Sequence, residues 1–188
     1  MSNAERIIRT LDGHLDHPFR LVLYGRAAIG LGFKDAPDPV KLTLDVDAII
    51  PVADLEGFRA DGSFWDAVEA TNSDLEKEGL YITHLFAATD VFVRSGWESE
   101  LVPIELAGLS WLRLFRPATV DLVLTKMMRG NDAQDMTDVE FLIRDGQITP
   151  AQLAAAFAIV QIPDMVELRD AFKRAQPLVM KIAEENSK

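Results

Sequence analysis

Two carboxylates alternate with apolar side chains in residues 43–50, whose sequence is TLDVDAII. In a β-strand, residues two apart point to the same face, so Asp45 and Asp47 are expected to stand together on one side. The apolar residues between and beside them are expected on the other side: Leu44, Val46 and Ala48. Adjacent like charges repel unless a cation neutralises them, and carboxylate oxygens suit Mg²⁺. The segment therefore predicts a strand that presents a site for a divalent cation.

A glycine turn precedes this strand by about twenty residues. The apolar residues 21–24 predict a buried strand, and the turn Gly25-Arg26-Ala27 follows it directly. Glycine allows a sharp turn into a short helix, and Gly32 can end that helix. The first part of the chain is thus expected to place a strand, a turn and a helix ahead of the acidic strand at residues 41–51.

Periodicity and capping residues predict the remaining elements. Helices are expected over residues 7–15, 63–79, 117–130, 133–144, 149–160 and from Asp164 to Pro177; further β-segments are expected over residues 81–86, 91–94 and 101–106. We therefore predict an α/β chain of the α+β kind, with a mixed sheet flanked by helices. Residues 1–116 would form the α/β core, and residues 117–188 a helical region packed on it as one compact unit.

Composition limits the classes of function. The chain has 188 residues and a net charge of −11, which argues against broad, nonspecific binding of nucleic acid. It contains no cysteine, which excludes disulfides, thiolate catalysis and zinc–thiolate sites. Residues 2–9 are mainly polar and charged and lack the apolar core of a secretion signal. The apolar residues 153–160 are too few to span a bilayer, which takes about 20. We expect a cytoplasmic protein with no membrane segment.

These features resemble the nucleotidyltransferase superfamily with the polymerase-beta-like fold, especially small bacterial members related to abortive-infection and toxin–antitoxin proteins. The resemblance covers roughly residues 20–145. Family members have an apolar strand, a glycine followed by glycine or serine at a helix start, and a strand with the pattern R-x-T-x-D-x-D. Here residues 41–47 are KLTLDVD, with lysine in the arginine place. The toxin-like members also carry a helical lysine followed by paired aspartates, which Lys126, Asp135 and Asp138 match.

The resemblance implies transfer of a nucleotidyl group from a nucleoside triphosphate to a hydroxyl of a protein, an RNA or a small molecule. Asp45 and Asp47 would bind Mg²⁺, or Mn²⁺ in its place. A third carboxylate usually completes the set, and Asp90 is the candidate, with Glu105 as its rival. The turn at Gly25 would present backbone N–H groups to the phosphates. The nucleotide would also be bound by Arg26 and by Lys126 or Arg129.

Several of these residues have a second interpretation. Arg26 stands where the family has a small residue, so it could crowd the nucleotide or clamp a phosphate oxygen. The acidic residues Asp132, Asp135 and Asp138 have helical spacing and could form a solvated edge, with Asp132 as an N-cap. Lys126 and Arg129 could simply be favourable charges near a helix C-terminus. The histidines show no metal-ligand or triad spacing and are interpreted as structural: His14, His17 and His84.

Three hypotheses follow. The first is the Mg²⁺-dependent nucleotidyltransferase described above. The second is a catalytically degenerate protein with the same fold that acts as a binding or regulatory partner, which Arg26 and Ala27 favour. The third is a plain metal-binding or structural domain whose acidic residues only confer solubility.

Overall fold

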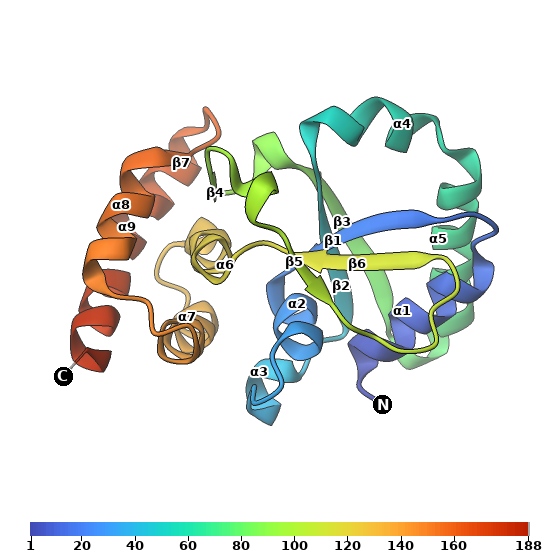
Figure 1. Cartoon of the computed structure of the whole chain (residues 1–188), viewed down its shortest axis with the longest axis horizontal. Helices are drawn as coiled ribbons and strands as arrows, with labels where there is room; N and C mark the ends of the chain where they lie inside the picture. Colours follow the sequence, from blue (N-terminus) through green and yellow to red (C-terminus); the bar gives the residue numbers. More distant parts are fainter. Residues whose placement is uncertain (188) are drawn as a thin grey trace. The chain divides into compact units, whose positions relative to one another are not determined.

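The structure is a computed structural model that describes residues 1–187 (Figure 1). The chain folds into two compact units. The first unit contains Met1–Ala87 and Val102–Arg116, and the second contains Ala88–Leu101 and Pro117–Lys188. The chain therefore crosses between the units three times, and residues 88–101 fold with the C-terminal region.

A five-stranded mixed sheet is the centre of the first unit. Its strands are β1 (Phe19–Tyr24), β2 (Asp45–Ile50), β3 (Tyr81–Ala87), β5 (Val102–Ile104) and β6 (Leu112–Arg116), in the order β3-β2-β1-β6-β5. Strand β1 is antiparallel to β2 and parallel to β6, whereas β2 is parallel to β3. Together with the helices around it, this sheet confirms the predicted α+β fold class.

Helices surround the sheet of the first unit: α1 (Asn3–His14), α2 (Gly25–Gly32), α3 (Asp38–Lys41), α4 (Leu55–Ala60) and α5 (Gly62–Leu75). The 3₁₀ helices η1 (Val52–Asp54) and η2 (Glu76–Glu78) precede α4 and follow α5. Ile7, Ile8 and Leu11 of α1 are fully buried, as their helical spacing predicts. Helix α1 packs against α5, and α2 lies against β1 and β2.

The carboxylate of Asp12 ties α1 to the start of β6. It accepts hydrogen bonds from the backbone N–H groups of Ser110, Trp111 and Leu112, at 2.7 to 2.9 Å. Asp12 is only 7% exposed. Burial on its own raises the pKa of Asp12, but the three backbone hydrogen bonds outweigh it, so the pKa of this carboxyl is lowered overall.

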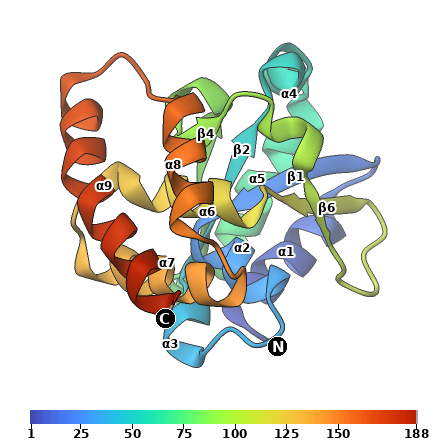
Figure 2. The ribbon, with the colours of Figure 1, turned by 60° about the vertical axis from the view of Figure 1, so that its left-hand side comes forward.

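The second unit is mainly helical (Figure 2). It contains α6 (Thr119–Lys126), α7 (Ala133–Asp145), α8 (Pro150–Ile159) and α9 (Val166–Asn186). A short ladder pairs β4 (Val93–Arg94) with β7 (Val160–Gln161), and the 3₁₀ helices are η3 (Ala88–Asp90), η4 (Trp97–Glu100) and η5 (Met127–Arg129). Asp121 of α6 is fully buried and accepts hydrogen bonds from the backbone and guanidinium of Arg94, which holds β4 on this helix.

Several expected boundaries are wrong. Strand β2 begins at Asp45 and not at residue 41, because α3 occupies residues up to Lys41. Leu44 is 60% exposed and does not pack on the buried face, since it precedes the strand. The last helix continues through Pro177 to Asn186. The expectations also omitted α4 and β6, although Leu112 and Leu114 alternate with polar Arg113.

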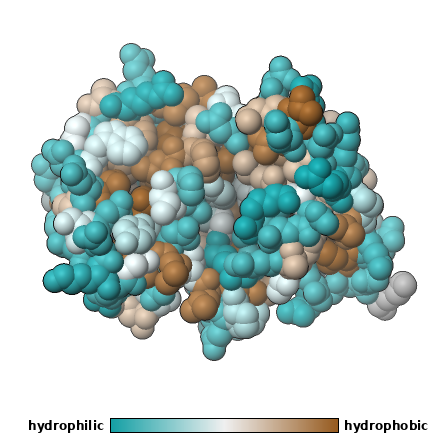
Figure 3. Space-filling model, turned by 180° about the vertical axis from the view of Figure 1, so that it is seen from behind, coloured by the Kyte–Doolittle hydropathy of each residue, from teal (hydrophilic) through white to brown (hydrophobic). Residues whose placement is uncertain are grey.

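In the view of Figure 3, hydrophilic side chains cover most of the surface, with apolar residues between them. This agrees with the 26% of charged residues in the chain. Across residues 1–187, no helix combines the length and the apolar character that crossing a membrane requires.

The contacts of Asp12 generate a first prediction. Replacing Asp12 with alanine leaves three backbone N–H groups without their acceptor, so Asp12→Ala should lower the free energy of unfolding by about 3 kcal/mol. Because the pKa of Asp12 is lowered in the folded state, its contribution is present above the unfolded pKa and is lost as the pH falls through the folded pKa. Urea unfolding at several pH values measures both effects.

The matched control for this prediction is Asp66→Ala on α5, whose carboxylate is exposed. That variant should unfold within about 0.5 kcal/mol of the wild type. Equal stability of the Asp12 and Asp66 variants at neutral pH would show that the three hydrogen bonds contribute nothing.

Candidate functional site

Asp45 and Asp47 form a pair of carboxylates at the start of β2, called the carboxylate pair below. Both side chains reach the hydroxyl of Thr83 on β3: Oγ1 of Thr83 donates to Oδ1 of Asp47 at 2.7 Å and lies 3.5 Å from Oδ2 of Asp45. Asp45 also accepts a hydrogen bond of 2.7 Å from the hydroxyl of Thr43. The two carboxylates therefore stand together on one side of the strand, as the alternation of their positions indicates.

Two neighbouring residues of β3 hold Asp47. Besides the Thr83 hydroxyl, Nδ1 of His84 lies 3.1 Å from Oδ1 of Asp47. The pairing of β2 with β3 explains this, because Val46 faces Ile82 whereas Ala48 faces Leu85. Asp47 thus lies opposite two residues of β3, Thr83 and His84, which is the arrangement of a β-bulge. Without the bulge, Thr83 and His84 would point to opposite faces and could not both contact Asp47.

The electrostatic environment disfavours a charge on Asp47. Burial raises the pKa of Asp47, and the charge of Asp45 raises it further, although hydrogen bonds from Thr83 and His84 act in the opposite direction. The side chain of Asp47 is 21% exposed. Burial also raises the pKa of Tyr24, and the charges of Asp47 and Asp45 add to this effect, so the phenol stays protonated. A cation at the pair would relieve the repulsion between the carboxylates.

Gly25 brings the N-terminus of α2 against Asp47. Its φ is +65°, a conformation that side chains rarely adopt, and a Cβ at this position would lie 3.6 Å from Oδ2 of Asp47. The N-cap Tyr24 makes no side-chain hydrogen bond to the helix, and the first turn of α2 contains no acidic residue. The backbone N–H groups at the start of α2 thus lie beside the carboxylate pair, where they favour an anion.

Arg26 follows in the first turn of α2. Its Nη1 lies 3.4 Å from the carbonyl oxygen of Leu42, in the segment that leads into β2. Ala27 is buried and has no polar group to offer to a ligand. The first unit therefore brings together Asp45, Asp47, Gly25 and Arg26 from the predicted site.

Neither proposed third carboxylate joins the pair within the first unit. Glu105 follows β5, which is three strands away from β2 in the sheet. Ile104 pairs with Leu114 of β6, which in turn pairs with Leu21 of β1. Asp47 pairs with Tyr24 at the end of β1, so Glu105 also lies toward the other end of the sheet. Asp90 is exposed at the end of η3 and belongs to the second unit. Among residues 1–187, no group of three or more histidine, aspartate and glutamate side chains is arranged to hold a metal ion.

Lys126 lies in a buried charge cluster of the second unit. Its ammonium nitrogen is 2.6 Å from Asp138 and 3.1 Å from Asp135, and both carboxylates are buried. Arg129 binds the other oxygen of Asp135 at 2.6 Å and also pairs with Asp132. The hydrogen bond to Asp135 is the main cause that raises the pKa of Arg129. Asp132 caps α7 as expected, but a solvated edge is the wrong interpretation for Asp135 and Asp138.

Sequence reasoning missed Thr83 and His84. His84 was interpreted as structural, whereas its ring is exposed, contacts Asp47 and stacks on Phe86 with the ring centroids 5.1 Å apart. A polar Thr-His pair inside the otherwise apolar segment 81–86 was the available signal. The bulge that brings both side chains to Asp47 leaves no mark in the sequence.

Comparison of the chain with protein-family models, with curated proteins and with solved structures found no match in any of the three.

The environment of Asp47 generates a second prediction. Asp47→Asn should raise Tm by about 3 °C at neutral pH, because the amide removes a charge that burial and Asp45 disfavour and its oxygen can still accept from Thr83. The pKa of Asp47 is raised in the folded state, so wild type loses stability as the pH rises through that pKa, and the difference between the two proteins should vanish in acid. Thermal unfolding without divalent cations measures the difference in Tm between the two proteins. A lower Tm for the variant at neutral pH would contradict the prediction.

The cluster around Lys126 generates a third prediction. Lys126→Met removes the ammonium that lies 2.6 Å from buried Asp138 and 3.1 Å from Asp135, while Arg129 still pairs with Asp135, and should lower the free energy of unfolding by about 3 kcal/mol. The matched control is Lys173→Met on α9, whose side chain is 74% exposed and pairs weakly with Asp170 at 3.7 Å. Chemical denaturation compares the two variants, and an equal effect would rule out a structural role for Lys126.

Proposed function

We propose that this protein binds a nucleoside triphosphate together with Mg²⁺ at the carboxylate pair and transfers a nucleotidyl group to a hydroxyl of a protein, an RNA or a small molecule. The observation that carries the proposal is the meeting of two features on adjacent strands. Asp45 and Asp47 stand side by side on β2, and the N-terminus of α2 lies directly beside Asp47. The resemblance of residues 20–145 to nucleotidyltransferases supports the same assignment.

The residues at the pair fit a hard divalent cation. The available ligands are the carboxylate oxygens of Asp45 and Asp47, with the Thr83 hydroxyl between them. Mg²⁺ is usually held by one or two carboxylates and by the phosphates of the substrate, so a third protein carboxylate is not required for this mode of binding. Mn²⁺ suits the same oxygen ligands. When bound, the cation would supply charge neutralisation at the phosphates.

The start of α2 would bind the phosphate groups. Its backbone N–H groups and helix dipole favour anions, and they need no side chain to do so. Arg26 in the same turn adds a positive charge. In nucleotidyl transfer, the acceptor hydroxyl gives its proton to solvent water and its oxygen bonds to the α-phosphorus, while the bond between the α-phosphorus and the bridging oxygen breaks and pyrophosphate leaves. Thr83 and His84 would keep Asp47 oriented, and protonated Tyr24 would add no negative charge nearby.

A second candidate function is a catalytically degenerate protein of the same fold that serves as a binding partner, for example in a toxin–antitoxin complex in the cytoplasm. Two observations favour it. Ala27 offers no hydroxyl at the start of α2, and the ammonium of Lys126 is already held by two buried carboxylates. A role of Lys126 or Asp90 at the nucleotide stays a prediction from the sequence.

Nucleotide titration tests the proposed function. Calorimetry with ATP, GTP, CTP and UTP should show binding of at least one of them, weakened about tenfold or more when Mg²⁺ is omitted, because the carboxylate pair binds phosphate through the cation. Asp45→Asn should weaken binding in Mg²⁺ to a similar degree. Asp66→Asn on α5 is the matched control, since it removes an exposed carboxylate outside the pair, and it should bind like the wild type.

A transfer assay separates the two candidates. The protein is incubated with each labelled triphosphate, Mg²⁺ and a cell extract, and labelled products are resolved by size and by nuclease or protease sensitivity. Product that disappears in Asp45→Asn supports the enzyme. Nucleotide binding without product, together with a stoichiometric partner from the native host, supports the second candidate. Absence of binding for all four nucleotides refutes the first proposal.

A further inference from the structure

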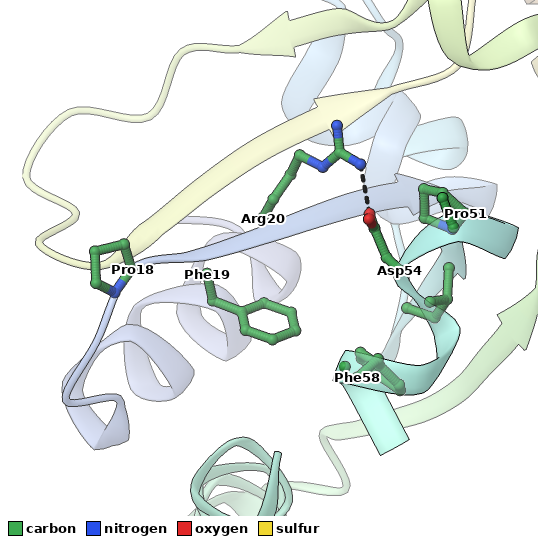
Figure 4. Close-up of a pocket in the computed structure, with 9 residues that line it drawn as sticks. Pro18, Phe19, Arg20, Pro51, Asp54 and Phe58 are labelled. Atoms are coloured by element: carbon green, nitrogen blue, oxygen red, sulfur yellow. Dashed lines mark hydrogen bonds and ion pairs between the residues drawn. The ribbon is translucent and has the colours of Figure 1, made fainter. Parts of the chain in front are cut away.

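A cavity lies in the first unit at the ends of β1 and β2 that are remote from the carboxylate pair (Figure 4). It is lined by Phe19, which begins β1, and by Ile50, which ends β2. The pair lies at the other ends of these strands, where Asp47 faces Tyr24. The cavity has a volume of about 400 Å³, within the range of small-molecule sites. No part of the proposed nucleotide site lines it.

Fixed aromatic rings form the apolar part of this cavity. Phe19 stacks on Phe64 with ring centroids 4.1 Å apart and planes inclined by 16°, and Phe58 lies 5.9 Å from Phe19. Phe64 is fully buried, so the ring of Phe19 is held in place by packing on a residue of the core. Pro51 adds a rigid apolar surface between β2 and η1. Rings that are already fixed lose little conformational entropy when a flat ligand packs on them.

One ion pair supplies the polar groups of the cavity. Nη2 of Arg20 lies 2.5 Å from Oδ2 of Asp54. Figure 4 shows this contact joining β1 to η1 near the rings of Phe19 and Phe58. Both side chains are about half exposed. A guanidinium has five N–H donors and a carboxylate has two oxygens, so this contact uses only part of the hydrogen-bonding capacity of either group. The pair presents donors and acceptors side by side, with no net charge.

We propose that this cavity binds a small, neutral, planar aromatic compound with a lactam or amide edge. The ring would pack on Phe19 and Phe58, the carbonyl oxygen would accept from Arg20, and the N–H would donate to Asp54. The edge matches the ion pair because a lactam carries an acceptor and a donor next to each other. The proposal does not depend on the nucleotidyltransferase assignment.

The charges of the cavity select against ionic ligands. An anion that binds Arg20 must approach the carboxylate of Asp54, and a cation that binds Asp54 must approach the guanidinium of Arg20. Either ion would be repelled by one member of the pair, whereas a neutral dipolar edge is attracted by both. The cavity should therefore discriminate between ligands of equal size by their charge.

The test uses three bicyclic probes of similar size: isoquinolin-1-one, 1-naphthoate and 1-naphthylmethylammonium. Amide NMR spectra of the full chain are recorded during each titration. Isoquinolin-1-one should shift the resonances of residues 19–20, 53–54 and 57–58 with a Kd of about 1 mM or tighter. The two ions should bind about tenfold more weakly or worse.

Variants separate this cavity from other parts of the chain. The double variant Arg20→Met/Asp54→Leu keeps the net charge and should lose about tenfold in affinity for isoquinolin-1-one, since the buried lactam edge loses both partners. Two controls should leave the affinity unchanged: Glu56→Gln, an exposed residue of α4 that does not line the cavity, and Asp45→Asn in the carboxylate pair. Because Arg20 and Asp54 are half exposed, their replacement should cost little stability.

Three results would overturn the proposal. The first is the absence of shifts at the lining residues with isoquinolin-1-one. The second is equal or tighter binding of either ion, which would make this a site for charged ligands. The third is unchanged affinity in the double variant, which would place the probe elsewhere.

Discussion

The bulge between β2 and β3 is the constraint on which the candidate site depends. It places two donors, Thr83 and His84, opposite the single residue Asp47. A carboxylate in this position is costly, because burial disfavours the charge of Asp47 and Asp45 carries a like charge nearby. In a regular ladder only one of the two donors could reach it. The bulge thus allows an acidic pair to stand in a strand that is otherwise part of the core.

Four carboxylates of this protein have contrasting electrostatic environments. Asp12 receives three backbone hydrogen bonds, and its pKa is lowered. Asp135 and Asp138 are paired with Lys126 within hydrogen-bonding distance. Asp47 differs from them, since its pKa is raised in spite of its two partners. Groups whose charge the fold leaves incompletely compensated are characteristic of functional sites, whereas fully compensated charges serve the structure. This contrast is the physical reason to seek a ligand at Asp47.

Local sequence patterns predicted those structural features that depend on the residues of a single segment. The two-residue spacing of Asp45 and Asp47 fixes their common side, and the alternation of strand-like and helical segments gives the fold class. Contacts that depend on register or burial were not predictable. His84 reaches Asp47 only through the bulge, and the spacing of Asp135 and Asp138 is the same whether a helix face is solvated or buried. Leu44 was misplaced because a strand pattern does not show where the strand begins.

The carboxylate pair and the aromatic cavity occupy opposite ends of the same two antiparallel strands. Tyr24 and Asp47 pair at one end, and Phe19 and Ile50 lie at the other. Along β2, Asp47 lies three residues before Ile50, which is about 10 Å, and along β1, Tyr24 lies five residues after Phe19, which is about 17 Å, so a small molecule packed on Phe19 is not expected to touch the pair. The two sites also differ in chemistry, since one concentrates uncompensated negative charge and the other offers a neutral ion pair beside aromatic rings. A ligand that needs a divalent cation belongs at the first site, and one that binds equally well without it belongs at the second.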